Sequence, residues 1–248
     1  MKARISILLL AALGLAAEVS AAAPADYKPM KVIQTSTPMY PRALSEIGIK
    51  EGEVHVSIQV DDQGNLMDHL VTFYSHAEFA DSAVAALKKW KFEPAWLNGE
   101  PRAATVELTF VYESQGLTVV NLSPSVYVLR RSMELMPGSY GYRVATLRQL
   151  DRIPTPKKVV TPVYPVETPE GPRAASVTVR FYIDEQGRVR LPAVSRLTAE
   201  GDDIFASAAI GAVSQWEFEP PTARGRPVLV EARQDFNFNP KVVAKNTE

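Results

Sequence analysis

The sequence predicts an α+β protein with two tandem small domains, each an antiparallel β-sheet in the order strand–strand–helix–strand with a helix packed on one face. Two observations predict it. Several short phrases occur twice in the same order, and between them the apolar residues alternate between the period of a half-buried strand and that of an amphipathic helix. The chain of 248 residues is long enough for two small domains.

The clearest repeat is WKFEPAWLNGEP at Trp90–Pro101, which returns as WEFEPPTARGRP at Trp216–Pro227. Upstream of it TPMYP returns as TPVYP, and VDDQG returns as IDEQG. The two tryptophans are 126 residues apart, and a period of this length is too long for a solenoid. The repeat therefore indicates two copies of one domain.

The first half of each copy predicts a hairpin. Val54, Val56 and Ile58 alternate with polar residues, and the second copy repeats this alternation. The DDQG and DEQG phrases that follow are turns, and their acidic pairs are expected to serve turn geometry. Second strands are expected at about Leu66–Phe73 and Val189–Ser195, and Pro192 places the latter at an edge or in a bulge.

A helix and a closing strand complete each copy. Apolar residues recur at steps of 4, 4 and 3, which is one face of a helix. The repeated phrase then ends the helical pattern, because Pro94 and Pro220 break it and the aromatic residues bury the corner between helix and sheet. The helix-face residues are Phe79, Ala83, Leu87 and Trp90, and in the second copy Phe205, Ala209, Val213 and Trp216.

The expected boundaries follow from these elements. Residues 1–22 are predicted to be a signal peptide, residues 27–112 the first domain and residues 159–238 the second. The connector at 113–158 is expected to contain some strand structure, and the tail at 239–248 is expected to be frayed.

The N-terminus has the pattern of a secretory leader. Lys2 and Arg4 precede an apolar run, Ile5–Ala17, and small residues follow, with cleavage expected after Ala21 or Ala22. The run is shorter than the roughly 20 residues of a membrane-spanning helix. We therefore expect an exported periplasmic protein, and an uncleaved inner-membrane anchor is the alternative.

Composition excludes several kinds of site. The chain has no cysteine, so disulfides, thiolate metal sites and cysteine nucleophiles are absent. The formal net charge of −1 gives no reason to expect a nucleic-acid partner. His55, His69 and His76 have no counterpart in the second copy and lack the pattern of a metal site or a catalytic triad. We expect no enzyme activity, metal or cofactor.

The ordered set P-x-YP, V-x-V-x-(V/I)-D-x-x-G, an alanine-rich helix, W-x-F-x-P, G-x-P and a closing strand resembles the C-terminal domain of TonB family proteins. The resemblance covers about Lys31–Tyr112 and again Val159–Phe238. It implies a periplasmic domain of Gram-negative bacteria that grips outer-membrane transporters by adding an extended segment of the transporter to a sheet edge. The protein lacks the long proline-rich stalk of a full energy transducer after its leader.

The final strand of each copy is the edge that the resemblance implies. Its outward charges also fit a solvated edge that is protected from aggregation. Besides a transporter-docking protein, two alternatives remain: a membrane-anchored energy transducer, and an envelope scaffold that self-associates through strand edges into a homo-oligomer. The candidate partner-binding residues are Thr105, Glu107 and Thr109 in the first copy and Glu231, Arg233 and Asp235 in the second.

Overall fold

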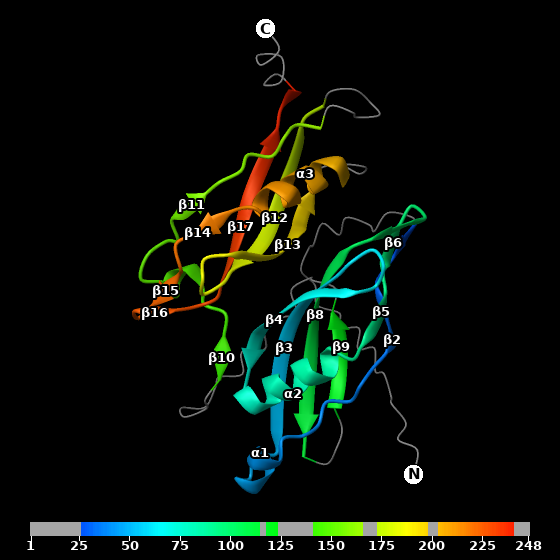
Figure 1. Cartoon of the computed structure of the whole chain (residues 1–248), viewed down its shortest axis with the longest axis vertical. Coiled ribbons are helices and arrows are strands. Elements are labelled where there is room, and N and C mark those ends of the chain that lie inside the picture. The colour runs from blue at the N-terminus through cyan, green and yellow to red at the C-terminus, as the bar shows by residue number, and fades with distance from the viewer. Residues whose placement is uncertain (1–25, 115–117, 124–140, 166–172, 198–202, 241–248) are drawn as a thin grey trace, which may run out of the picture.

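The computed structural model describes residues 26–114, 118–123, 141–165, 173–197 and 203–240. The expected leader, the strand-like stretch 125–131 of the connector and all but the start of the expected tail lie outside these residues. Two helix-on-sheet domains follow one another along the chain, as the repeat predicts (Figure 1).

Domain 1 has a five-stranded antiparallel sheet in the order β10-β4-β3-β8-β9, with helix α2 on one face (Figure 1). Short strands and one short helix surround this unit; β2 pairs with β5, and β6 lies between β1 and β7. The elements are β1 (Tyr27–Lys28), β2 (Lys31–Gln34), α1 (Arg42–Glu46), β3 (Glu51–Val60), β4 (Leu66–Tyr74), α2 (Ala77–Leu87), β5 (Lys91–Glu93), β6 (Ala95–Leu97), β7 (Glu100–Arg102), β8 (Ala104–Glu113), β9 (Thr118–Ser123) and β10 (Tyr142–Arg143).

Domain 2 repeats the unit with a smaller sheet in the order β13-β12-β17 and with α3 on the same face. Two small ladders lie beside it, β11 with β14 and β15 with β16. The elements are η1 (Leu147–Gln149), β11 (Pro156–Lys158), β12 (Ala175–Ile183), β13 (Val189–Leu197), α3 (Asp203–Val213), β14 (Glu217–Phe218), β15 (Thr222–Ala223), β16 (Arg226–Pro227) and β17 (Val230–Phe238).

The repeated phrase is the joint between helix, sheet and N-terminal segment. Both helices end before the tryptophan of the phrase, at Leu87 and Val213, so the expectation that the tryptophans lie on the helix itself is wrong. Each tryptophan lies one turn further on and is buried, and each indole N–H donates to a backbone carbonyl of the preceding segment. Trp90 donates to Ser36 at 2.9 Å and Trp216 to Val160 at 2.8 Å.

The two turn glycines explain why the hairpin phrase and the tryptophan phrase recur together. Gly64 has φ +85° and Gly187 has φ +82°, and the second β-strand of the hairpin begins two residues after each. A Cβ on Gly64 would lie 2.3 Å from the carbonyl oxygen of Phe92, and one on Gly187 would lie 2.0 Å from that of Phe218. The hairpin turn therefore packs directly against the backbone of the repeated phrase, and only glycine fits there.

The helix-free faces of the two sheets meet in part, which the sequence reasoning did not anticipate. A small buried cluster joins the domains, and the Tyr182 and Ser57 hydroxyls lie 3.4 Å apart across the contact. The Arg190 guanidinium also donates to the Asp68 carboxylate across it, at 2.8 Å from Nε. The cluster consists of Val144, Tyr182, Leu191 and Leu229, packed against Leu70 and Tyr142.

Candidate partner-binding edge

Strand β17 lies along one margin of the domain 2 sheet (Figure 1). It pairs with β12 from Val230 to Phe238 without a register shift. On its other side, the described part of the chain supplies one backbone bridge, from Ala145 to Val230 at the start of the strand, and η1 lies close by. Most of β17 therefore presents an open backbone edge.

The bridge also shows which backbone groups face the open side. The Ala145 N–H donates to the Leu229 carbonyl at 2.9 Å, so the Leu229 carbonyl points away from β12. The N–H and C=O of one strand residue point to the same side, and the side alternates along the strand. The outward backbone groups along β17 therefore belong to Glu231, Arg233, Asp235 and Asn237.

The side chains of these residues are held on the outer face of the sheet. Glu231 lies 3.2 Å from the Arg233 guanidinium and 3.8 Å from that of Arg180. The Thr178 hydroxyl donates to the Asp235 carboxylate at 2.6 Å. Because these charges are satisfied by neighbours within the sheet, the chemistry that β17 offers along its edge is that of its backbone.

The other face of β17 is anchored in the core. Phe236 packs against Trp216, with ring centroids 5.8 Å apart, and Phe238 packs against Phe205 at 5.0 Å and Tyr164 at 6.5 Å. Both phenylalanines are buried. Strand addition works best on a rigid template, and this aromatic packing holds the edge straight.

The opposite margin of the domain 2 sheet, β13, is a poor template. Leu191 has φ +48°, Pro192 has no N–H to donate, and the β12–β13 register shifts at two places. Part of β13 also packs on domain 1 through Arg190 and Leu191. The expected edge or bulge at Pro192 is confirmed, and β17 remains as the regular edge of this sheet.

In domain 1 the expectation that the final strand is an edge is wrong, because β8 lies between β3 and β9. Strand β9, from the connector, pairs antiparallel with β8 from Glu107 to Tyr112. Glu107 and Thr109 therefore lie in the part of β8 that is paired on both sides, and Thr105 lies just before it. On the β3 side the three residues pair with Ser57, His55 and Gln59 in that order. At the opposite margin, β10 pairs with the end of β4 at Phe73 and Tyr74.

Sequence reasoning treated the connector as separate from the domains, although it contained a signal. The sequence VYESQGLTVV at Val111–Val120 has a hairpin pattern, since strand-forming residues and a β-branched run flank the turn-favouring letters SQG. If this pattern is interpreted as a hairpin that continues from the closing strand, it predicts a further strand at the position of β9.

Glu107 instead belongs to an ionic cluster on the outer face of domain 1. The His55 ring lies 2.6 Å from the Glu53 carboxylate through Nε2 and 3.4 Å from the Glu107 carboxylate through Nδ1. Burial lowers the pKa of His55, but hydrogen bonds to Glu107 and Glu53 and their negative charges outweigh it and raise the pKa to about 9. Glu107 thus has a role inside the domain.

The first member of each acidic hairpin pair, Asp61 or Asp184, serves turn geometry, as expected. The Asp61 carboxylate accepts the backbone N–H groups of Gln63 and Asn65, at 2.9 and 2.7 Å. The Asp184 carboxylate accepts those of Gln186 and Arg188, at 3.0 and 2.8 Å.

In the described ranges no three histidine, aspartate or glutamate side chains are grouped as a metal site would require. The same ranges hold no helix that combines the length and the apolar character of a membrane span.

Comparison with known proteins gives the same two units. The family described as Gram-negative bacterial TonB protein C-terminal matches residues 36–114 and 160–240, which together make up more than half of the chain. Over 90 residues the chain is 37% identical to Protein TonB of Vibrio cholerae serotype O1, and the matched part is 36% of this chain and 36% of that protein. The chain thus spans about a third of the length of this relative. It belongs to the TonB family, with two tandem TonB C-terminal domains.

Proposed function

We propose that the protein binds an extended segment of a protein partner by adding it as a strand to β17, and that the partner is an outer-membrane transporter reached from the periplasm. The observation that carries the proposal is the open, regular backbone edge from Arg233 to Asn237, in a chain of the TonB family. Main-chain hydrogen bonds would supply the affinity, and domain 2 would be the binding copy.

Domain 1 and the connector would act as support. The connector covers β8 with β9 and the end of β4 with β10, and it then reaches β17 through Ala145. The first domain therefore offers little open edge, and the buried contact with domain 2 fixes the second domain beside it.

The test uses a pair of variants at one position. Asp235→Pro removes an outward backbone N–H but no hydrogen bond to β12, whereas Asp235→Ala removes only the side chain and its bond to Thr178. Binding of synthetic peptides from the extended segments of outer-membrane transporters is measured by calorimetry. We expect Asp235→Ala to bind within about twofold of the unaltered protein and Asp235→Pro to bind at least about tenfold more weakly, a loss of about 1.4 kcal/mol.

Equal binding by the two variants would overturn strand addition at β17. A fold control comes from circular dichroism, which should be native for both variants. Sedimentation of the unaltered protein separates the scaffold alternative: a dimer that Asp235→Pro converts to a monomer, without peptide binding, would mean that β17 pairs with a second copy instead.

A further inference from the structure

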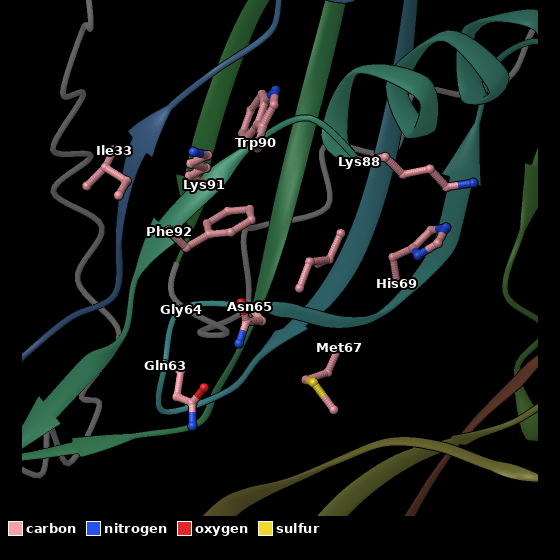
Figure 2. A pocket seen from close by; sticks show the side chains of 11 residues that line it. Ile33, Gln63, Gly64, Asn65, Met67, His69, Lys88, Trp90, Lys91 and Phe92 are labelled. Carbon is pink, nitrogen blue, oxygen red and sulfur yellow. The ribbon is translucent and has the colours of Figure 1, made fainter.

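Domain 1 contains a recess away from β17, where the tip of the β3–β4 hairpin meets β2, β5 and the end of α2 (Figure 2). Its volume is about 780 Å³. Figure 2 shows Lys88 reaching over His69 on one side, Lys91 and Ile33 on the other, and the Phe92 ring between them. Neither the joint nor the β17 edge uses the two lysines.

The charge of the recess is positive and uncompensated. Lys88 and Lys91 are exposed, and no lining residue is acidic. Within the described part of the chain, neither ammonium has a carboxylate within 4.0 Å. The neighbouring Asp68 is bound to Arg190 of domain 2. Burial and the nearby Lys88 charge lower the pKa of His69, so at neutral pH the ring adds hydrogen-bonding capacity without charge.

The rim of the recess is apolar. Ile33 and Met67 are each 64% exposed, and both line it. Trp90 and Phe92 lie beneath them and are buried. A ligand that covered the rim would remove this apolar surface from water and could bring an anion beside one of the lysines.

The second copy shows that the fold does not require these features. Aligning Trp90 with Trp216 puts Ser214 at the place of Lys88 and Glu217 at that of Lys91. Glu217 lies 4.0 Å from Lys158, so its charge is compensated. Aligning Leu66 with Val189 puts Arg190 at the place of Met67. Lys88, Lys91 and the exposed Met67 therefore have no like residue at the equivalent places of domain 2.

We propose that this recess binds a short peptide segment of a protein partner in which an acidic side chain alternates with apolar ones. The carboxylate would pair with Lys88 or Lys91, and the apolar side chains would cover Ile33 and Met67. A small free anion would leave the rim exposed. A membrane surface needs several lysines, since each contributes only about 1 kcal/mol near anionic lipid. The site is separate from β17 and does not depend on strand addition.

The test titrates the ¹⁵N-labelled chain with acetylated, amidated hexapeptides of alternating Glu and Leu, followed by amide chemical shifts. We expect the shifts to centre on Lys88, Lys91 and Phe92. The double variant Lys88→Glu with Lys91→Glu should raise the Kd at least tenfold. Lys89→Glu is the matched control, because Lys89 is an exposed lysine beside them that does not line the recess, and its Kd should stay within twofold.

Three results would overturn the proposal: equal binding of a Lys-Leu hexapeptide, an unchanged Kd in the double variant, or shifts that centre on β17 and vanish in Asp235→Pro. Vesicles of phosphatidylglycerol form the last arm. If they bind through the two lysines and the acidic peptide does not, the recess meets a lipid surface and the proposal is wrong. Retained binding of the acidic peptide in Asp235→Pro supports the recess, whatever happens at β17.

Discussion

Domains 1 and 2 are built from one repeated unit, but they differ at the margins of their sheets. In both copies the helix, the hairpin and the tryptophan phrase pack in the same way. In domain 1 the final strand is covered by β9, whereas in domain 2 no described segment pairs with most of the outer side of the final strand. The comparison teaches that the repeated residues determine the unit, and that the segments between the repeats determine which copy can accept a partner strand.

The largest effect should come from the joint that the copies share. Gly187→Ala puts a Cβ 2.0 Å from the Phe218 carbonyl oxygen at positive φ, so we expect unfolding free energy to fall by about 3 kcal/mol or more. Gly225→Ala is the control, since φ is +72° there but nothing lies within 4 Å, and it should cost about 1 kcal/mol. Chemical denaturation measures both. Similar losses in the two variants would mean that the turn does not pack against the joint.

Alkaline pH should weaken domain 1 selectively. The pKa of His55 is about 9 in the folded protein and near 6.5 when unfolded, so the stability from its protonation is complete below pH 6.5 and is lost as pH rises through 9. We expect a loss of about 1–2 kcal/mol after allowing for partial exposure. Domain 2 has Thr178 at the position equivalent to His55, so this loss should be confined to domain 1.

The measurement is denaturation at pH 6.5 and pH 9.5, with His55→Gln as the control that should abolish the difference. His69 does not contribute in this window, because its pKa is lowered. An unchanged pH difference in His55→Gln would show that another group is responsible.

A smaller effect should follow when the contact between the domains is weakened. Arg190→Ala leaves the partly exposed Asp68 carboxylate without its guanidinium, and we expect a loss of about 1 kcal/mol and a separation of the two domains' unfolding steps. Arg188→Ala is the control, because the Arg188 guanidinium donates to Asp184 and Gln186 within the domain 2 turn. Scanning calorimetry should show broadening only in Arg190→Ala, and equal traces would contradict the support role of domain 1.

Much of the fold could be predicted from the sequence, because local periodicity encodes it. Val54, Val56 and Ile58 occupy every second position of their strand and are fully buried. Phe79 and Phe205 are the first buried residues on the apolar faces of the two equivalent helices. The contact between the domains could not be predicted in the same way. Tyr182 lies at an outward position of its strand, yet it is 3% exposed, because the other domain covers it.

The repeated residues also could not show that the final strand of domain 1, which holds half of the candidate site residues, is not an edge. Whether a strand is an edge depends on what pairs with it from elsewhere in the chain, and Glu107 and Glu231 have similar local patterns. Only the connector, through β9 and Ala145, distinguishes them. A repeated motif can therefore predict a unit and its final strand without predicting which copy leaves that strand open.

Amide hydrogen exchange of the unliganded protein tests the central claim most directly, because it reports on each backbone N–H along both final strands. We predict alternation on β17: fast exchange at Arg233, Asp235 and Asn237, and slow exchange at Gln234 and Phe236. On β8, the amides of odd- and even-numbered residues alike should exchange slowly between Glu107 and Tyr112. Uniform protection along β17, or alternation on β8, would contradict the account that domain 2 carries the open edge.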